Sequence, residues 1–174
     1  MDFRDIKEFF KDSLKYIIMI IVILFLVICV VSFHQVMGPS MNKTLSEGDV
    51  VLVNKFIYKF RKITRNEIVV LKHDEKLLIK RIVGLPGESV AYNNNILYIN
   101  GKGYNEKFVS SKTDDFDIKD LGYETIPDDY YLVLGDNRAN SMDSRDFGLV
   151  KKSDIVGKAW FHSSSEEDGM GLIK

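Results

Sequence analysis

The sequence predicts a mainly β domain that follows one amino-terminal transmembrane helix. Residues 16–33, YIIMIIVILFLVICVVSF, are 18 residues without a charge, and a helix rising about 1.5 Å per residue would nearly cross a hydrocarbon core over that length. After this run, short segments rich in β-branched residues alternate with turn residues. The 174 residues allow one membrane segment and one soluble domain with a real core, and no second full domain.

The apolar run is expected to stay in the mature protein as an anchor. A cleavable signal peptide is the alternative, but its apolar region is normally shorter and no small-x-small site follows Phe33. Four basic residues precede the run, and one lies in the 20 residues after it: Arg4, Lys7, Lys11 and Lys15 before, Lys43 after. The positive-inside rule therefore predicts a cytoplasmic segment over 1–15, a membrane helix over 16–33 and an extracytoplasmic domain over 34–174.

Charge and cysteine content exclude several classes of function. The net charge is -1, from 24 basic and 25 acidic residues, so the chain has no overall field that would attract nucleic acid. Cys29 is the one cysteine and lies inside the apolar run, so the chain can form neither an intramolecular disulfide nor a cysteine-based metal site.

The segments predicted as strands are joined by turns rich in glycine, asparagine and charged residues. They are residues 50–56, 67–72, 77–83, 130–134 and 156–161, with a hairpin over 90–100 that turns at Asn93-Asn94-Asn95. The polar residues 101–129 are predicted to be a surface insertion with little regular structure. The basic stretch 58–66, YKFRKITRN, is interpreted as a solvated hairpin edge, with contact to anionic lipid as the alternative.

Ser40 is the first candidate for a catalytic residue. Gly38 tolerates dihedrals that other residues avoid and Pro39 fixes its own φ, so Ser40 is expected in a stiff, exposed turn. Such a hydroxyl suits a nucleophile. The alternative is an ordinary Gly-Pro-Ser turn, and a catalytic interpretation therefore requires a base from elsewhere in the chain.

Lys80 is the candidate base. Side chains alternate along a strand, so Leu78, Lys80 and Ile82 share one face of the strand predicted over 77–83. Aliphatic neighbours on an inward face would desolvate the ammonium group and lower its pKa, which favours a neutral amine. The alternative is a lysine on a solvent-exposed face.

Residues 135–148, GDNRANSMDSRDFG, form a loop dense in hydroxyls, amides and opposite charges. Such a loop can stabilise itself by internal hydrogen bonds. An EF-hand calcium loop is rejected because Arg138 stands where that pattern requires an oxygen ligand, and no glutamate closes the loop.

Three segments, in order behind one anchor, resemble the type I signal peptidases, the membrane-anchored Ser/Lys enzymes that remove signal peptides from exported bacterial proteins. They are GPSMNKTL with GDVV, then KRIVGLPGE, then GDNRANSMDSRDFG. The match spans nearly the whole chain and is most similar to the single-anchor Gram-positive type. The resemblance implies a barrel-like pair of antiparallel sheets, in agreement with the strands predicted above.

The resemblance also implies roles for individual residues. Ser40 corresponds to the nucleophile, Lys80 to the general base, and Ser141 to a hydroxyl that orients the lysine amine. Asp143 and Arg145 stand where the family has a buried ion pair that supports the site. No metal or organic cofactor is implied. The implied partners are signal peptides of preproteins and the lipid bilayer, with the secretion translocon as a further candidate.

Two residues depart from the family pattern. Lys43 occupies the position of a proline in most relatives, so the turn after the nucleophile is expected to be less rigid. Gly38 stands where some relatives carry a hydroxyl that helps to hold the oxyanion, which leaves the Ser40 backbone N–H as one donor and the second unidentified. These departures keep two alternatives open: a catalytically silent relative, and a peptidase dedicated to one pilin-like substrate.

The substrate is expected to be an extended peptide that pairs with an edge strand beside Ser40. Narrow pockets would admit only small side chains at the first and third positions before the scissile bond. The walls are predicted at residues 36–39 and 81–84. The candidate substrate-binding residues are Val36, Met37, Pro39, Met41, Arg81, Ile82 and Val83.

Overall fold

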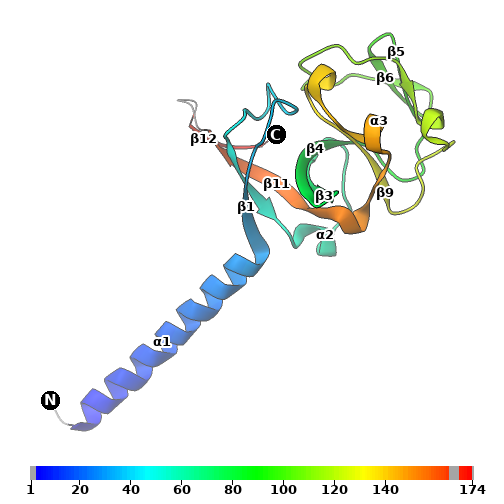
Figure 1. Cartoon of the computed structure of the whole chain (residues 1–174). Helices are drawn as coiled ribbons and strands as arrows, with labels where there is room; N and C mark the ends of the chain where they lie inside the picture. The colour runs from blue at the N-terminus through cyan, green and yellow to red at the C-terminus, as the bar shows by residue number, and fades with distance from the viewer. Residues whose placement is uncertain (1–2, 165–168, 174) are drawn as a thin grey trace. The chain divides into compact units, whose positions relative to one another are not determined.

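The computed structural model describes residues 3–164 and 169–173, and it includes their side chains except at 3–10 and 26–29. The chain divides into two compact units, Met1–Ser32 and Phe33–Lys174. Helix α1, Phe3–Val30, makes up most of the first unit (Figure 1). It ends three residues before the predicted boundary, because Val31–Gln35 forms strand β1 and pairs with β2. Among the described residues, no helix is both long enough and apolar enough to span a membrane.

The second unit contains two sheets, and the pairs formed among strands β2 to β12 are antiparallel. The larger sheet has the order β1 (Val31–Gln35), β2 (Val50–Asn54), β11 (Ile155–Ser163), β3 (Ile68–His73), β4 (Lys76–Gly84), β9 (Tyr130–Leu134) and β10 (Val150–Lys151), with β12 (Met170–Leu172) on β11. The smaller has the order β7 (Lys102–Tyr104), β6 (Ile96–Ile99), β5 (Val90–Asn93) and β8 (Phe116–Asp117). In Figure 1, β5 and β6 lie at the end of this unit away from β12.

Short helical turns connect the strands. They are α2 (Ile57–Phe60), α3 (Ser144–Phe147), and the 3-10 turns η1 (Ile118–Leu121), η2 (Arg138–Asn140) and η3 (Lys152–Asp154). The turns η2 and α3 both lie in the polar loop after β9, next to the candidate site residues. In α3, the Asp143 side chain accepts a hydrogen bond from the Arg145 backbone N–H and caps the helix.

The mainly β, antiparallel fold is confirmed, but the barrel-like form is not. Among the described residues each sheet has two free ends, β1 and β10 in one and β7 and β8 in the other, so neither closes on itself. Each segment predicted as a strand contains one, within a few residues at its ends. Residues 101–129 contain β7, β8 and η1, which is more regular structure than the polar composition predicted.

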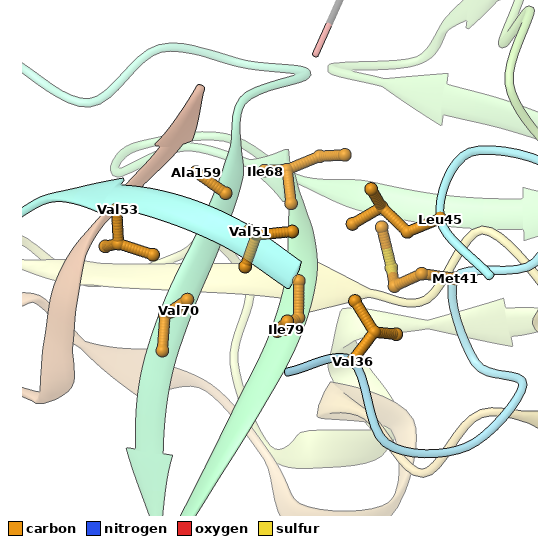
Figure 2. Packing of buried hydrophobic residues seen from close by; sticks show 9 residues of the cluster. All are labelled: Val36, Met41, Leu45, Val51, Val53, Ile68, Val70, Ile79 and Ala159. Atoms are coloured by element: carbon orange, nitrogen blue, oxygen red, sulfur yellow. The ribbon is translucent and has the colours of Figure 1, made fainter. Parts of the chain in front are cut away.

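Both faces of β3 are buried over its first four residues, which explains the apolar sequence IVVL at 68–71, and the strand then ends in the polar residues Lys72 and His73. Ile68 and Val70 join one hydrophobic cluster, and Val69 and Leu71 join another on the opposite face. Figure 2 shows the first cluster, in which Val36, Met41 and Leu45 pack beside strand residues of the larger sheet. These three residues flank Ser40 in sequence, so the same cluster that stabilises the sheet also fixes the turn that carries the candidate nucleophile.

Candidate active site

The turn around Ser40 is held on both sides. Gly38 has a φ of 78°, a left-handed conformation that glycine adopts without a Cβ penalty. Behind it, the Asn42 N–H donates to the Pro39 carbonyl at 3.0 Å. Met41, the residue after Ser40, is fully buried. The expected stiff turn is therefore present, and its stiffness comes from backbone hydrogen bonds and from the buried side chain that follows it.

Lys80 reaches this turn from β4. Its Nζ donates a hydrogen bond to Ser40 Oγ at 2.7 Å, across 40 positions of sequence. The side chain is 3% exposed, and this burial is the largest cause that lowers the pKa of Lys80 from 10.5 to about 8. The Asp143 carboxylate opposes the shift and Arg145 adds to it. The structure thus brings a hydroxyl and a desolvated amine into direct contact.

The desolvation expected at Lys80 is present, and both aliphatic neighbours named for it belong to or pack against one core cluster, but only Leu78 also lines the pocket of Lys80. Leu78 is half-buried and lines the same pocket as Lys80. Ile82 is fully buried in a core cluster with Val69 and Val133. Of the two, Leu78 is therefore the one that shares the pocket of the amine.

The loop after β9 closes over the other side of Ser40. The backbone N–H of Asn137 donates to the Ser40 carbonyl at 3.0 Å, and its side-chain amide donates to the Pro39 carbonyl at 3.2 Å. A Cβ at Gly135 would lie 2.5 Å from the Ser40 carbonyl oxygen and closer still to Ser141 Oγ. Only a glycine permits this close approach of the two loops.

Asp143 and Arg145 form a two-pronged ion pair. Arg145 Nε lies 2.9 Å from Asp143 Oδ1, and Arg145 Nη2 lies 2.9 Å from Asp143 Oδ2. Asp143 is fully buried and also accepts from the Gly135 N–H at 3.0 Å, while Arg145 donates to the Arg138 carbonyl at 2.7 Å. The pair therefore fixes both ends of the loop segment that contains Ser141.

Ser141 lies beside Ser40, as the close approach to Gly135 shows. Its hydroxyl is buried and makes no hydrogen bond within the described part of the chain. An unsatisfied buried hydroxyl next to a reacting group is unusual, because such groups normally find a partner. The proposed orienting contact to the Lys80 amine is not formed in this structure, and the role of Ser141 stays a prediction.

The comparisons with known proteins agree with this geometry. A family model described as signal peptidase, peptidase S26, matches residues 8–163. The chain belongs to this family. It is 45% identical to Signal peptidase I V of Bacillus subtilis over 71% of this chain and 80% of that protein, and 39% identical to Signal peptidase IB of Staphylococcus aureus over 87% and 89%. A solved signal peptidase I from Enterococcus faecalis matches with a TM-score of 0.53 and 36% identity, over 56% of this chain and 97% of that one.

Lys43, the departure from the family pattern, adopts a backbone conformation that proline cannot. Its φ is 82°, whereas the proline ring fixes φ near about −65°. The turn is closed by hydrogen bonds from the Thr44 and Leu45 N–H groups to the Met41 carbonyl, at 3.0 and 2.8 Å. In this S26 peptidase the segment after Ser40 is thus held by helical-turn bonds rather than by a proline ring.

A pocket of about 730 Å³ opens beside Ser40 and Lys80. Its lining includes four of the candidate substrate-binding residues, Val36, Met37, Pro39 and Met41, as well as Gly38. The structure does not bring Arg81, Ile82 or Val83 into this pocket. Its opposite wall is formed instead by residues 75–80 and by Met142. The second wall therefore precedes Arg81 on β4, since the residues after Lys80 are buried in the interior.

Arg81 is used inside the protein instead of at the substrate pocket. It is 1% exposed, and its Nε and Nη2 lie 2.8 and 2.6 Å from the two carboxylate oxygens of Asp136. Thr44 donates to the same carboxylate at 2.5 Å. This buried network ties the segment after Ser40, strand β4 and the loop after β9 together. The sequence contains a signal for this position of Arg81. Lys80 and Arg81 are adjacent in an apolar strand, and a strand places adjacent side chains on opposite faces, so the two do not point into the same pocket.

Arg138 links the catalytic loop to the smaller sheet. Its guanidinium donates to the Gly135 carbonyl at 2.9 Å, to Tyr92 Oη at 2.6 Å and to Thr113 Oγ1 at 3.2 Å. It also forms a buried ion pair with Glu106 at 2.6 Å. In the sequence, Arg138 served only to exclude an EF-hand calcium loop. The residues around it do not indicate which distant side chains it contacts.

Candidate oxyanion donors are few around Ser40. Among the described residues, the Ser40 backbone N–H donates no hydrogen bond, so it is available to a substrate carbonyl. Gly38 has no side-chain donor, and a Cβ added at this position would meet no atom within 4 Å. The conformation, rather than a lack of space, is what requires glycine at this position.

Proposed function

We propose that this S26 peptidase is a membrane-anchored serine endopeptidase that removes signal peptides from exported preproteins. The observation that carries the proposal is the 2.7 Å contact between Ser40 Oγ and the buried amine of Lys80. Two further points support it: the family of the chain, and the relatives named signal peptidase I over most of its length.

The chemistry follows from a neutral amine at Lys80. With its pKa lowered to about 8, a substantial fraction of Lys80 is unprotonated at mildly alkaline pH. Ser40 Oγ attacks the scissile carbonyl while Lys80 Nζ takes its proton, and the protonated amine then gives that proton to the departing peptide nitrogen. Lys80 next removes a proton from water as the water attacks the acyl-enzyme, and returning it to Ser40 Oγ restores the site.

The negative oxygen of each tetrahedral intermediate requires hydrogen-bond donors. The Ser40 N–H is the donor that the site offers on the backbone, and one such donor is worth about 3 kcal/mol of barrier in other serine peptidases. Ser141 is proposed to orient the Lys80 amine once substrate displaces water. Its hydroxyl is buried beside the site and lacks another described partner, so it is free to turn toward Nζ.

The pocket beside Ser40 is proposed as the site for the peptide before the scissile bond. Its walls are Val36 to Met41 on one side and the start of β4 on the other, and an extended chain fits between two such segments. Selection for small residues at the first and third positions remains a prediction. Replacing alanine by phenylalanine immediately before the bond should abolish cleavage, and comparable cleavage of both peptides would refute narrow pockets.

Residues 16–33 are proposed as a single membrane anchor in the bacterial cell membrane, with the amino terminus in the cytoplasm. The support is the 18-residue uncharged run and the excess of basic residues before it. Protease added to spheroplasts should digest the domain over 34–174. Protection of that domain would reverse the orientation and separate the enzyme from exported substrates.

The decisive experiment incubates the detergent-solubilised chain with a preprotein and sequences the new amino terminus. Cleavage should follow a small residue and be lost in Ser40→Ala and in Lys80→Arg, because a guanidinium stays protonated and cannot accept the serine proton. Lys72→Arg, at an exposed lysine on the neighbouring strand, is the matched control and should retain activity. For the wild type, kcat/KM should rise with pH along a limb with an apparent pKa of about 8.

The alternatives predict different results. A catalytically silent relative would leave every preprotein intact. A peptidase dedicated to one pilin-like substrate would cleave that substrate and spare general preproteins. Substantial activity in a folded Lys80→Arg variant would instead show that another residue is the base.

A further inference from the structure

We propose that a basic, aromatic surface remote from the catalytic pocket docks this enzyme on anionic phospholipid headgroups. We call it the basic platform and define it as Lys55, Lys59, Phe60, Lys151 and Lys152. Its four lysines line a groove of about 570 Å³ together with Tyr58, Tyr130 and Ile155, and Phe60 directly follows Lys59 in the chain. None of its residues lines the pocket of Ser40 and Lys80.

The four lysines of the platform have no carboxylate partner. Among the described residues none of them forms a salt bridge, and Asp129 is the one acidic residue that lines the groove. Neighbouring basic residues behave differently, since Arg61 and Lys158 both pair with the buried Glu67. The local excess of positive charge is therefore real and is not neutralised within the described chain, although the net charge of the whole chain is close to zero.

Phe60 adds an apolar element to this charge. It is the last residue of α2, it is 85% exposed, and none of the residues of α2 is buried. An exposed phenylalanine that follows Lys59 gains nothing in water, but at a bilayer surface such a ring can enter the headgroup region while nearby ammonium groups remain at the phosphates. Exposed aromatic and basic residues together are the combination that binds at a membrane interface, and this favours a membrane over an acidic protein.

The platform begins close to the point where the chain leaves the proposed anchor. β1 pairs with β2, and the Val36 N–H donates to the Asp49 carbonyl, so β2 runs back toward the start of β1. Lys55 directly follows the last residue of β2, Asn54. His34 directly follows the apolar run 16–33. In Figure 1, α2 lies beside β11, at the end of the unit away from β5 and β6. This step rests on the proposed anchor, because a membrane at residue 33 lies within reach of Lys55.

Headgroup binding at this surface would orient the catalytic domain on the bilayer. Anionic lipid attracts each nearby lysine, and the attraction falls off within a Debye length. Arg61 and Arg65, which the sequence grouped with the basic stretch, pair with Glu67 and Glu88 and do not contribute. The lipid-facing charge comes instead from Lys55 and Lys59 together with Lys151 and Lys152, which are distant in sequence.

The test uses the full chain reconstituted in nanodiscs of brominated phosphatidylcholine, with or without phosphatidylglycerol. Trp160 is the one tryptophan, so a Trp160→Phe background carrying Phe60→Trp reports the platform alone. Bromine quenching should be at least about twofold stronger with phosphatidylglycerol, and roughly 0.5 M salt should remove the difference by shortening the Debye length. Changing all four platform lysines to glutamine should remove it as well. Lys102→Trp, on exposed β7, is the control and should show no lipid dependence.

A second readout needs no substitution in the platform. In wild-type enzyme, an amine-reactive ester should label the four platform lysines more slowly in phosphatidylglycerol nanodiscs, and label Lys102 and Lys112 at the same rate in both lipids. Equal labelling and equal quenching in the two lipids would overturn the proposal. Protection by soluble polyglutamate without any effect of phosphatidylglycerol would overturn it in favour of an acidic polypeptide.

The test also separates this proposal from the proposed catalytic function. The lysine-to-glutamine variant should cleave a soluble signal peptide in detergent at the wild-type rate, because the platform lies outside the catalytic pocket. If the unsubstituted platform shows no dependence on phosphatidylglycerol while wild-type cleavage is intact, only the platform is overturned. Absence of cleavage in the wild type overturns only the proposed function.

Discussion

Replacing Lys80 by methionine should inactivate the enzyme and, near neutral pH, make its fold more stable. Methionine keeps an unbranched side chain of similar length but carries no charge. Lys80 is 3% exposed, and burial is the main cause that lowers the pKa of its amine from 10.5 to about 8. Wherever the amine is protonated in solution, the folded protein therefore bears a cost that the unfolded chain does not.

The cost follows from the two pKa values. Each tenfold change in proton affinity is worth about 1.4 kcal/mol, so a fall from 10.5 to about 8 corresponds to about 3 kcal/mol. Between pH 8 and pH 10.5 the unfolded chain binds a proton that the folded chain does not, so wild-type stability rises with pH across this window. Below pH 8 the full cost applies, and above 10.5 it is gone. What then remains is the lost bond to Ser40, worth about 1 kcal/mol in the opposite direction.

Urea unfolding in detergent, followed by the fluorescence of Trp160, measures this difference. Lys80→Met should exceed the wild type by about 2 kcal/mol below pH 8, which is the charge cost of about 3 less about 1 for the lost bond to Ser40. Above pH 10.5 the charge cost is gone, and the variant should be about 1 kcal/mol less stable than the wild type. Lys72→Met, at an exposed position on β3, is the control and should show no such pH dependence. A Lys80→Met variant that is less stable than the wild type below pH 8, or a difference that is constant with pH, would refute desolvation as the source of the base.

Three further predictions follow from close contacts and backbone geometry. Gly135→Ala should lower kcat/KM for a signal peptide at least about 100-fold, because the added Cβ would displace Ser40 and its neighbours. Gly103→Ala is the control and should not lower it, because a Cβ there would lie 3.9 Å from the nearest atom. Equal rates for the two variants would refute the argument from the close approach of the two loops. Lys43→Pro should lower the melting temperature and Lys43→Gly should not, since the φ of 82° suits only glycine of the two. Glu106→Gln should cost about 3 kcal/mol in urea unfolding by leaving Arg138 buried without a counter-charge, and a cost under about 1 kcal/mol would contradict this.

The strands were predictable because their signal is local. The runs at Val50, Val90 and Tyr130 start strands at the predicted residues, since β-branched and aromatic residues between turn residues need no distant information. Ser40 and Lys80 were also predictable as candidates, from a stiff turn and from an amine among aliphatic residues. Their 2.7 Å contact was not, because it depends on how the turn packs against β4 through Met41 and Leu45.

Arg81 shows why the substrate residues were harder to predict. Its position next to Lys80 suggested a wall of the pocket, but the register of β4 turns adjacent side chains to opposite faces. Its partner Asp136 lies 55 residues further along the chain, and nothing local identifies it. The alternation of side chains along a strand therefore correctly places Lys80 and Arg81 on opposite faces of β4. The residues that Arg81 contacts could be identified only from the folded structure.

The low pKa of Lys80 depends on how its charged neighbours are arranged as well as on burial. Asp143 alone would raise the pKa of the amine and oppose its function as a base, and Arg145 lowers it. Because Arg145 contacts both oxygens of Asp143, the two act on Lys80 as a closely spaced pair whose fields largely cancel. Burial then remains the largest influence on the pKa. The same carboxylate accepts from the Gly135 N–H, so the ion pair in which Arg145 offsets the charge of Asp143 also holds the loop against Ser40.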